Sequence, residues 1–332
     1  MPHVAVVIPN WNGRRLLGAC LSGLCRQTFP DFEIILVDNG STDGSVASVR
    51  EHFSRVRVIS NEVNRGFAAG VNQGIRASDS PFVATLNNDT EVSPGWLAAL
   101  VAAAEGNPCV GMCASKMVFA DRPGVINSTG ICLDRVGIAW DRRGGEPDDE
   151  REAVPVEVFG PCGGAALYRR AMLNEVGLFD EDFFAYLEDV DLAWRARRAG
   201  WRCLYVPAAR VLHRHSATSR EGSPFKSFYL GRNKVWLILK NYPFARLWLY
   251  VPLVLAYDIS AVAYTIVTRG DVHALRGRLA GLTGIKKVWQ ERERRISDRP
   301  RDLQYLSPLE PPWRIPRRYR HLAPAERSRT GS

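Results

Sequence analysis

A run of amide and acid side chains follows an apolar stretch near residue 86. Phe82–Leu86 has the length and composition of a buried strand, and Asn87, Asn88 and Asp89 come directly after it. Open α/β sheets bind their ligands at the carboxyl ends of the strands. Asp89 could hold a hard divalent cation there, while Asn87 and Asn88 could hydrogen-bond to a phosphorylated, hydroxyl-rich ligand. An equally good alternative is a polar turn that caps a helix starting near Pro94.

A second group of acids lies near residue 189. Glu188, Asp189 and Asp191 open a segment with helical spacing, next to aromatic residues. Crowded carboxyl groups beside aromatic rings raise one another's affinity for protons, which suits a general base near neutral pH. The alternative is complementarity between acids and the positive end of a helix dipole. We expect Asp191 to be structural, bonded to the backbone or to Arg195 four positions on.

Two histidines and seven cysteines are possible metal ligands. His213 and His215 could form half of a zinc site, but no matching cluster of Cys or His completes four ligands. The seven cysteines form no Cys-x-x-Cys pair and lie mostly in apolar runs, so we expect reduced, buried thiols. Arg232 is a weaker candidate for contacting phosphate, and a plain surface position is its alternative.

Apolar runs of strand length alternate with helical patterns over the first hundred residues. The strand-like runs are Val4–Ile8, Ile34–Val37, Val56–Ile59 and Phe82–Leu86. Four strand–helix units predict an α/β fold with a doubly wound, mostly parallel sheet and right-handed crossovers. The loops after the strands converge at one edge of such a sheet. Their polar residues are Asn10, Asn12, Asp38, Asp43, Asn61, Asn64, Asn88 and Asp89.

The turn after the first strand excludes two common classes of nucleotide site. Pro9 to Arg14 lacks the Gly-x-Gly-x-x-Gly of dinucleotide enzymes, and no Gly-x-x-x-x-Gly-Lys-Ser/Thr occurs in the chain. What remains is Asp38, at the end of the second strand, as an acceptor for a base or ribose. A nucleoside diphosphate would reach from Asp38 to Asp89. Further on, the glycine turn at Gly163 and Gly164 allows close approach of the backbone to a ligand.

Five strings in the chain resemble the successive signatures of family 2 glycosyltransferases with a GT-A fold, and the nearest subgroup is rhamnosyltransferase-like. The strings cover roughly residues 4 to 216 in the family's order, and together they are far more specific than any one of them. They are Val7–Gly13, Val37–Ser45, Asn64–Asn72, Leu86–Asp89 and Phe179–Arg195.

The resemblance implies roles for individual residues. Asp189 would deprotonate the acceptor hydroxyl. Asp89 would be the last acid of the Asp-x-Asp metal motif and would hold Mg²⁺ or Mn²⁺, with His213 joining it. The first acid of that motif is Asn87 here, which leaves a single motif carboxylate. The expected donor-binding residues are Pro9, Asn10, Asn12, Asp38, Asn64, Gly66, Asn72, Asn87 and Asn88, and the expected acceptor-site residues are Gly163, Gly164 and Glu188.

The expected reaction is an inverting glycosyl transfer from a dTDP- or UDP-linked sugar, with dTDP-L-rhamnose as the expected donor and a polyprenyl-linked or cell-envelope glycan as the acceptor. A nucleotidyltransferase is one alternative, but it needs a Gly-rich, basic loop where Pro9–Gly13 lies. A non-catalytic sugar-nucleotide-binding scaffold at the membrane is the other. Asn87 favours the scaffold, whereas Asp38, Asp89 and Asp189 oppose it.

The most apolar stretch of the chain is Leu247–Val267, which Pro252 and Asp258 interrupt. Its length is near the roughly 20 residues that span a bilayer. A carboxylate at the centre of a spanning helix costs ~2.5 to 3.5 kcal/mol on insertion scales. We therefore expect a helix that lies in or dips into the membrane interface.

The net charge of +9 comes entirely from residues 269–332. A basic segment that follows an apolar helix, with Trp289 in it, suits anionic lipid headgroups better than nucleic acid. No export signal precedes the first strand, so we expect catalysis at the cytoplasmic face of the inner membrane. The expected organisation is a GT-A domain at 1–220, a helical extension at 221–299 that contacts the membrane through 244–299, and a basic, partly disordered tail at 300–332.

Overall fold

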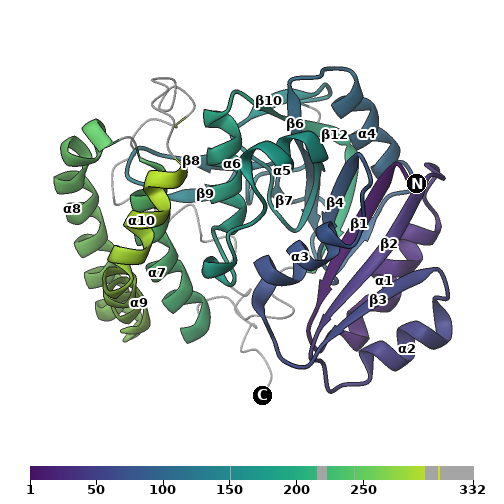
Figure 1. Ribbon diagram of the computed structural model, residues 1–332, viewed down its shortest axis with the longest axis horizontal. Coiled ribbons are helices and arrows are strands. Elements are labelled where there is room, and N and C mark those ends of the chain that lie inside the picture. Colours follow the sequence, from purple (N-terminus) through teal and green to yellow (C-terminus); the bar gives the residue numbers. More distant parts are fainter. Residues whose placement is uncertain (150, 215–222, 243, 296–305, 307–332) are drawn as a thin grey trace, which may run out of the picture.

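A mixed sheet lies at the centre of the protein, with helices on both faces and a group of helices at one end (Figure 1). The computed structural model describes residues 1–149, 151–214, 223–242, 244–295 and 306. His215 and the predicted tail at 300–332, apart from Leu306, lie outside the described residues.

Alternating strands and helices build the first hundred residues, as predicted. β1 pairs in parallel with β2 and β4, and β2 pairs in parallel with β3. Val4, Val6 and Ile8 of β1 pack in one core with α1, whereas Ala5 and Val7 pack in a second core with α3. Both faces of the strands are therefore buried, which explains their unbroken apolar runs. The elements are β1 (Val4–Asn10), α1 (Arg14–Cys25), β2 (Phe32–Asn39), α2 (Ser45–His52), β3 (Val56–Asn61), α3 (Gly66–Arg76) and β4 (Phe82–Leu86).

Beyond β4 the sheet becomes mixed, with antiparallel strands joining the parallel ones. Its order is β10-β12-β6-β11-β4-β1-β2-β3, and β11 runs antiparallel to both of its neighbours. A long excursion of short strands precedes β11, and no single crossover helix brings it back parallel to β6. The elements are β5 (Thr90–Val92), α4 (Trp96–Glu105), β6 (Val110–Phe119), β7 (Ile126–Ser128), β8 (Ile131–Leu133), β9 (Ala139–Asp141), β10 (Val156–Val158), β11 (Ala165–Arg169), α5 (Arg170–Val176), η1 (Glu181–Phe183), α6 (Glu188–Arg198) and β12 (Arg202–His213).

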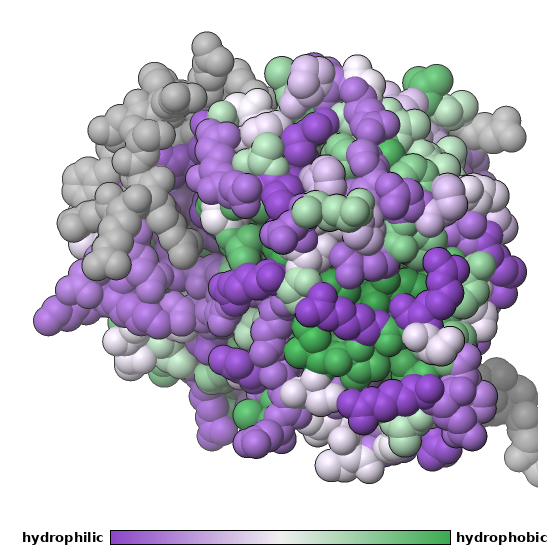
Figure 2. Space-filling model, turned by 45° about the vertical axis from the view of Figure 1, so that its right-hand side comes forward, coloured by the Kyte–Doolittle hydropathy of each residue, from purple (hydrophilic) through white to green (hydrophobic). Residues whose placement is uncertain are grey.

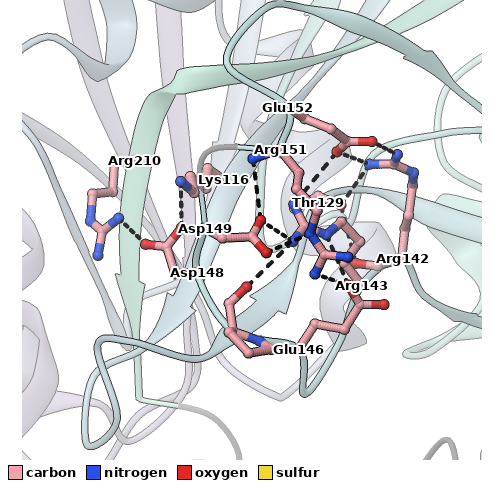
Figure 3. Close-up of polar contacts among 11 residues, drawn as sticks. Lys116, Thr129, Arg142, Arg143, Glu146, Asp148, Asp149, Arg151, Glu152 and Arg210 are labelled. Atoms are coloured by element: carbon pink, nitrogen blue, oxygen red, sulfur yellow. Dashed lines mark hydrogen bonds and ion pairs between the residues drawn. The ribbon is translucent and has the colours of Figure 1, made fainter.

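The charged segment at 142–149 is tied to the sheet by ion pairs, although Gly145, Glu146 and Pro147 within it are exposed (Figure 3). Asp148 pairs with Lys116 of β6 and Arg210 of β12, and only 8% of its side chain is exposed. The segment is thus fixed over two strands. The other charged residues of this network are Arg142, Arg143, Glu146, Asp149, Arg151 and Glu152.

The cysteines divide between the core and the surface. Cys20, Cys113 and Cys203 are buried, and all seven thiols are free, as expected for reduced residues. Cys25 and Cys109 are exposed, so the expectation of buried thiols is wrong for these two. Both lie at element ends, where an apolar neighbourhood in sequence does not guarantee burial.

Four helices form the C-terminal extension at the end of the molecule opposite α1 and α2 (Figure 1). α7 and α9 approach each other closely at Gly277 of α9. Any side chain at this position would overlap the carbonyl group of Phe228 in α7, so the contact requires glycine. The helices are α7 (Pro224–Asn241), α8 (Phe244–Arg269), α9 (His273–Thr283) and α10 (Ile285–Arg295).

Within the described residues, one helix is long and apolar enough to cross a membrane, the part of α8 from Leu247 to Arg269. Only 11% of its apolar window is buried inside the protein. The carboxylate of Asp258 faces the protein, where Nζ of Lys234 and Nη2 of Arg278 each lie 2.8 Å from its Oδ1. The large apolar residues that α8 exposes are Trp248, Leu249, Leu255, Ile259, Tyr264 and Val267.

The surface over the N-terminal half is different. Seen from that side, it is mostly hydrophilic, with apolar areas among the charged residues (Figure 2). Exposed large apolar side chains such as Trp11, Val63 and Val154 are scattered along the sequence outside the extension, whereas α8 carries six on one helix.

Candidate active site

Asp189 lies at the start of α6, beside the glycine turn that precedes β11. Its Oδ2 accepts a hydrogen bond from the amide of Gly163 at 2.8 Å, and its Oδ1 accepts one from the amide of Val190 at 2.8 Å. Since β11 is antiparallel to β4, with Ala165 opposite Leu86, this turn lies at the carboxyl end of β4. The structure therefore brings Asp189 to the edge that carries the polar run at 87–89.

The two neighbouring acids of α6 differ in their affinity for protons. Burial raises the pKa of Asp189 to about 6, even though backbone N–H groups stabilise its charge. Burial and the adjacent charge of Asp189 hold the pKa of Glu188 well above its ordinary value, and Oε2 of Glu188 accepts no hydrogen bond from the described residues. The backbone N–H groups favour the ionised form of Asp189, and Glu188 has no such donors at Oε2. Asp189 is consequently the better candidate for a base.

Side chains from three strand ends are hydrogen-bonded to one another at the predicted donor edge. Nδ2 of Asn10 donates to Oδ1 of Asp38 at 2.8 Å, and Nδ2 of Asn88 donates to Oδ1 of Asn10 at 2.7 Å. Ser41 donates to Oδ1 of Asp38 from its hydroxyl at 2.6 Å and to Oδ2 from its amide at 3.0 Å. Because a carboxylate oxygen accepts about two hydrogen bonds, Oδ2 of Asp38 has room for one more donor.

Asn12 and Asn64 shape the loops around this network. Asn12 has a φ of 50°, and its Oδ1 accepts a hydrogen bond from the amide of Thr42 at 2.9 Å. Oδ1 of Asn64 accepts one from the amide of Gly66 at 2.9 Å. Gly66 has a φ of 86°, and a Cβ there would lie 2.6 Å from Phe184. Only glycine satisfies both the backbone angle and the close approach.

Pro9 and Asn87 lie next to the same edge. Pro9 is opposite Val37 in the pairing of β1 with β2. The amide of Asn87 donates to the carbonyl oxygen of Gly164 at 2.8 Å, and a Cβ on Gly164 would lie 3.0 Å from Nδ2 of Asn87. The residues predicted for the donor and for the acceptor are thus in direct contact.

The position of Asn72 contradicts its predicted contact with the nucleotide. The side chain is 1% exposed, and its Nδ2 donates to the carbonyl oxygen of Phe179 at 2.8 Å and to Glu181 at 2.9 Å. Its Oδ1 accepts from the amide of Phe179 at 3.1 Å. Both amide hydrogens and the oxygen are engaged, so Asn72 fixes the segment before α6 and does not face a ligand.

Asp89 and His213 form the candidate metal site. Oδ1 of Asp89 is buried, accepts no hydrogen bond from the described residues and lies 3.3 Å from Nε2 of His213. Nδ1 of His213 lies 2.7 Å from Oδ1 of Asn127, an acceptor, so Nδ1 carries the ring hydrogen and Nε2 faces the carboxylate. A buried carboxylate oxygen without a donor, next to an oriented imidazole, fits a divalent cation.

A second group of acids could hold a metal ion, but a lysine side chain lies among its carboxylates instead. Carboxyl oxygens of Asp180, Asp182 and Glu291 lie within 4.8 Å of one another, close enough to hold a metal ion. Nζ of Lys240 is buried among them, 2.5 Å from Asp180, 2.7 Å from Glu291 and 3.7 Å from Asp182. This ammonium compensates the carboxylates, so the cluster serves as a buried ion-pair network.

The position of Arg232 matches neither of its two expected roles, a contact to phosphate or a plain surface position. Its Nη2 donates to the carbonyl oxygens of Asp182 at 2.7 Å and Phe183 at 2.9 Å, and the guanidinium lies over the ring of Trp236. Asp191, by contrast, is structural as predicted: Nε of Arg195 donates to its Oδ2 at 2.8 Å.

Sequence reasoning missed several residues that orient the site. Asn127 orients His213, and Asn233 contacts the segment before Asp189. Their partners lie 86 and 50 positions away in the chain, so no local pattern could reveal them. The role of Ser41 could have been predicted from the sequence, because a hydroxyl three positions after Asp38 can donate a hydrogen bond back to its carboxylate.

The fold and the site define a glycosyltransferase of the GT-A type, and comparison with known proteins identifies the family. The chain belongs to glycosyl transferase family 2, whose model matches residues 5–177. Asp189 and His213 lie beyond that matched range.

Two individual relatives show which members of the family this chain is similar to. The N-acetylglucosaminyl-diphospho-decaprenol L-rhamnosyltransferase of Mycobacterium tuberculosis is 32% identical over 244 residues, which cover 67% of this chain and 78% of the relative. The pre-mycofactocin glycosyltransferase of the same species is 30% identical over 234 residues, or 69% of this chain and 46% of the relative. The predicted rhamnosyltransferase-like membership is confirmed.

A solved structure supports the fold. A mannosyltransferase from Pyrobaculum calidifontis, in complex with GDP-Man and Mn²⁺, has a TM-score of 0.54 at 19% identity, covering 88% of this chain and 84% of its own. The GT-A fold is thereby confirmed. Together, the family match and the relatives confirm a glycosyltransferase.

Proposed function

We propose that this enzyme is an inverting glycosyltransferase that transfers L-rhamnose from dTDP-L-rhamnose to a polyprenyl-linked acceptor. The observation that carries the inverting mechanism is Asp189, a partly exposed carboxylate that the amides of Gly163 and Val190 hold at the edge where β4 ends, with a pKa of about 6. The rhamnosyltransferase of M. tuberculosis, whose name specifies a decaprenol-linked acceptor, supports the choice of sugar and acceptor.

The chemistry proposed for Asp189 is a single displacement. Its carboxylate takes the proton from the acceptor hydroxyl as that oxygen attacks the anomeric carbon, and the bond from this carbon to the diphosphate oxygen breaks. Gly163 and Val190 hold the carboxylate through their amides, so it keeps one orientation while the proton moves. The pKa of Glu188 is held well above its ordinary value, which disfavours a second negative charge beside Asp189.

The donor nucleotide binds across the strand ends in this proposal. Oδ2 of Asp38 accepts one hydrogen bond from the base or ribose, and the amides of Asn10 and Asn88 keep that carboxylate in place. Asn87 and Gly164 line the path between nucleotide and acceptor. A Mg²⁺ or Mn²⁺ ion held by Asp89 and His213 would neutralise charge on the departing diphosphate.

The acceptor is proposed to come from a membrane that α8 contacts. The apolar side chains of α8 are exposed, while its one carboxylate is paired with Lys234 and Arg278 on the protein side. Such a helix can lie in the interface without exposing charge to lipid. We place the enzyme at the cytoplasmic face of the membrane, where nucleotide sugars and lipid-linked glycans meet.

Donor hydrolysis tests the proposal. Purified protein with Mn²⁺ is given a panel of nucleoside-diphosphate sugars, and release of the nucleoside diphosphate is followed with and without a polyprenyl-diphosphate N-acetylglucosamine acceptor. We expect release from dTDP-L-rhamnose, increased by the acceptor and abolished by Asp89→Ala. Release from another donor alone would overturn the choice of sugar. Product with retained anomeric configuration would overturn the mechanism.

A further inference from the structure

The backbone just before Asp189 is in an unusual conformation. Phe184, Tyr186 and Leu187 have φ values of 63°, 70° and 67°, although none is glycine. In the described part of the chain only two other non-glycine residues, Asn12 and Arg143, have positive φ. Such conformations cost free energy and persist only when their surroundings hold them.

One amide of α7 holds this segment. Nδ2 of Asn233 lies 2.9 Å from the carbonyl oxygen of Phe183, 2.8 Å from that of Ala185 and 2.7 Å from that of Tyr186. The side chain is fully buried. An amide nitrogen has two hydrogens, so three carbonyl groups share them, and all three must turn toward one point.

The next side chain of α7 orients that amide. Nε of Arg232 donates to Oδ1 of Asn233 at 2.9 Å, which directs Nδ2 at the carbonyl groups. The same guanidinium bonds to the carbonyl oxygens of Asp182 and Phe183. Four carbonyl groups, those of Asp182, Phe183, Ala185 and Tyr186, are therefore held by side chains of α7, so their peptide planes cannot rotate independently of that helix.

The segment also touches the donor side. The carbonyl oxygen of Phe184 accepts a hydrogen bond from the amide of Ala68 at 3.3 Å, at the start of α3. Phe184 also lies against Gly66, where any Cβ would overlap it. The conformation of this segment thus sets the distance between the predicted donor loop and the base that follows.

We propose that Asn233, oriented by Arg232, is a positioning residue for catalysis: it fixes the backbone of residues 183–187 so that Asp189 meets the acceptor hydroxyl. The inference rests on the proposed role of Asp189. It makes α7, which lies outside the residues matched by the family model, a part of the active-site framework. Asn233 itself contacts no reacting atom.

Asn241 provides a matched control on the same helix. It is 2% exposed, and its Nδ2 donates to Oδ1 of Asp191 at 2.7 Å, so it holds α6 but not the segment at 183–187. Asn233→Ala and Asn241→Ala each remove one buried amide from α7. Both should lower the thermal unfolding midpoint by similar amounts.

The experiment measures kcat, the KM for dTDP-L-rhamnose and the pH profile of wild type, Asn233→Ala, Asn241→Ala and Asp189→Asn, below the unfolding temperature of each. For Asn233→Ala we expect kcat to fall about 100-fold with the donor KM within about threefold, since misplacement affects the chemical step. The acid limb of its pH profile, the range in which kcat falls as the pH drops, should shift relative to that of wild type. Asn241→Ala should keep both the wild-type kcat and acid limb.

Equal losses of kcat in the two alanine variants, with unchanged acid limbs, would overturn the positioning role while leaving the proposed function intact. An active Asp189→Asn would instead overturn the proposed base. If Asn233→Ala does not fold, Arg232→Lys decides: it keeps the charge but loses the planar fork that orients Asn233. A lower kcat at unchanged donor KM supports the proposal, and a wild-type kcat refutes it.

Discussion

The donor edge and the segment before Asp189 are stabilised in opposite ways. At the donor edge, loops that follow neighbouring strands bond to one another, as Asn10 does to Asp38 and Asn12 to Thr42. The segment at 183–187 depends on α7, about 50 positions later in the chain. The predicted donor edge is thus held mainly by bonds among its own loops, whereas the segment before the proposed base is held by a C-terminal helix.

The largest expected effect is on the catalytic side. Asp189→Asn keeps the size of the side chain but removes the base, so kcat should fall about 10³-fold, within the range that general bases contribute. The KM for the donor should change little. Steady-state rates with saturating acceptor measure the loss. A variant that retains more than about a tenth of the wild-type kcat would exclude Asp189 as the base.

Removal of the cation should affect both sides. Chelation with EDTA, or Asp89→Ala, is expected to lower kcat/KM about 100-fold, because charge on the leaving diphosphate is then uncompensated. Added Mn²⁺ should restore the chelated wild type but not the variant. Isothermal titration of Mn²⁺ in the presence of the nucleoside diphosphate provides a readout other than activity. Equal Mn²⁺ affinity in both proteins would contradict the assignment of Asp89.

The pH dependence comes next in size. Asp189 must be ionised to accept a proton, and its pKa of about 6 means that the ionised fraction falls as the pH drops below that value. At pH 5 the rate should be about tenfold below its plateau. The control is the fluorescence spectrum, which should show folded protein at both pH values. A flat profile between about pH 5 and 7 would rule out a base with this pKa.

The smallest expected effect is on the donor edge. Asn10→Ala removes the amide that joins Asp38 to Asn88, and should raise the donor KM roughly fivefold while kcat and the acid limb stay near wild type. This is the opposite of the pattern expected for Asn233→Ala. A shifted acid limb in Asn10→Ala would show that the two sides are not independent.

What the sequence predicted well is local. Apolar runs followed by Asx residues identified the parallel half of the sheet and its binding edge, because strand length and side-chain type are both local properties. The roles expected for Asp189 and Gly163 came from the family resemblance, and the hydrogen bond between them was not predicted.

The sequence predicted poorly those residues whose contacts lie far away along the chain. Asn72 carries the right chemistry for a ligand, but its position within α3 turns it toward Phe179. Nothing near Asn233 in the sequence indicates three carbonyl groups from another element. The ion pairs of Asp148 have no local signal for the same reason, since Lys116 and Arg210 lie on distant strands.

The ion pair between Asp258 and Lys234 has a mechanical consequence. It pins α8 near its midpoint to α7, so α8 cannot roll about its long axis without separating two buried opposite charges. Lys234 directly follows Asn233 in the sequence. A force that tilts or rolls α8 is therefore transmitted through this ion pair to the helix whose Asn233 holds the segment before Asp189.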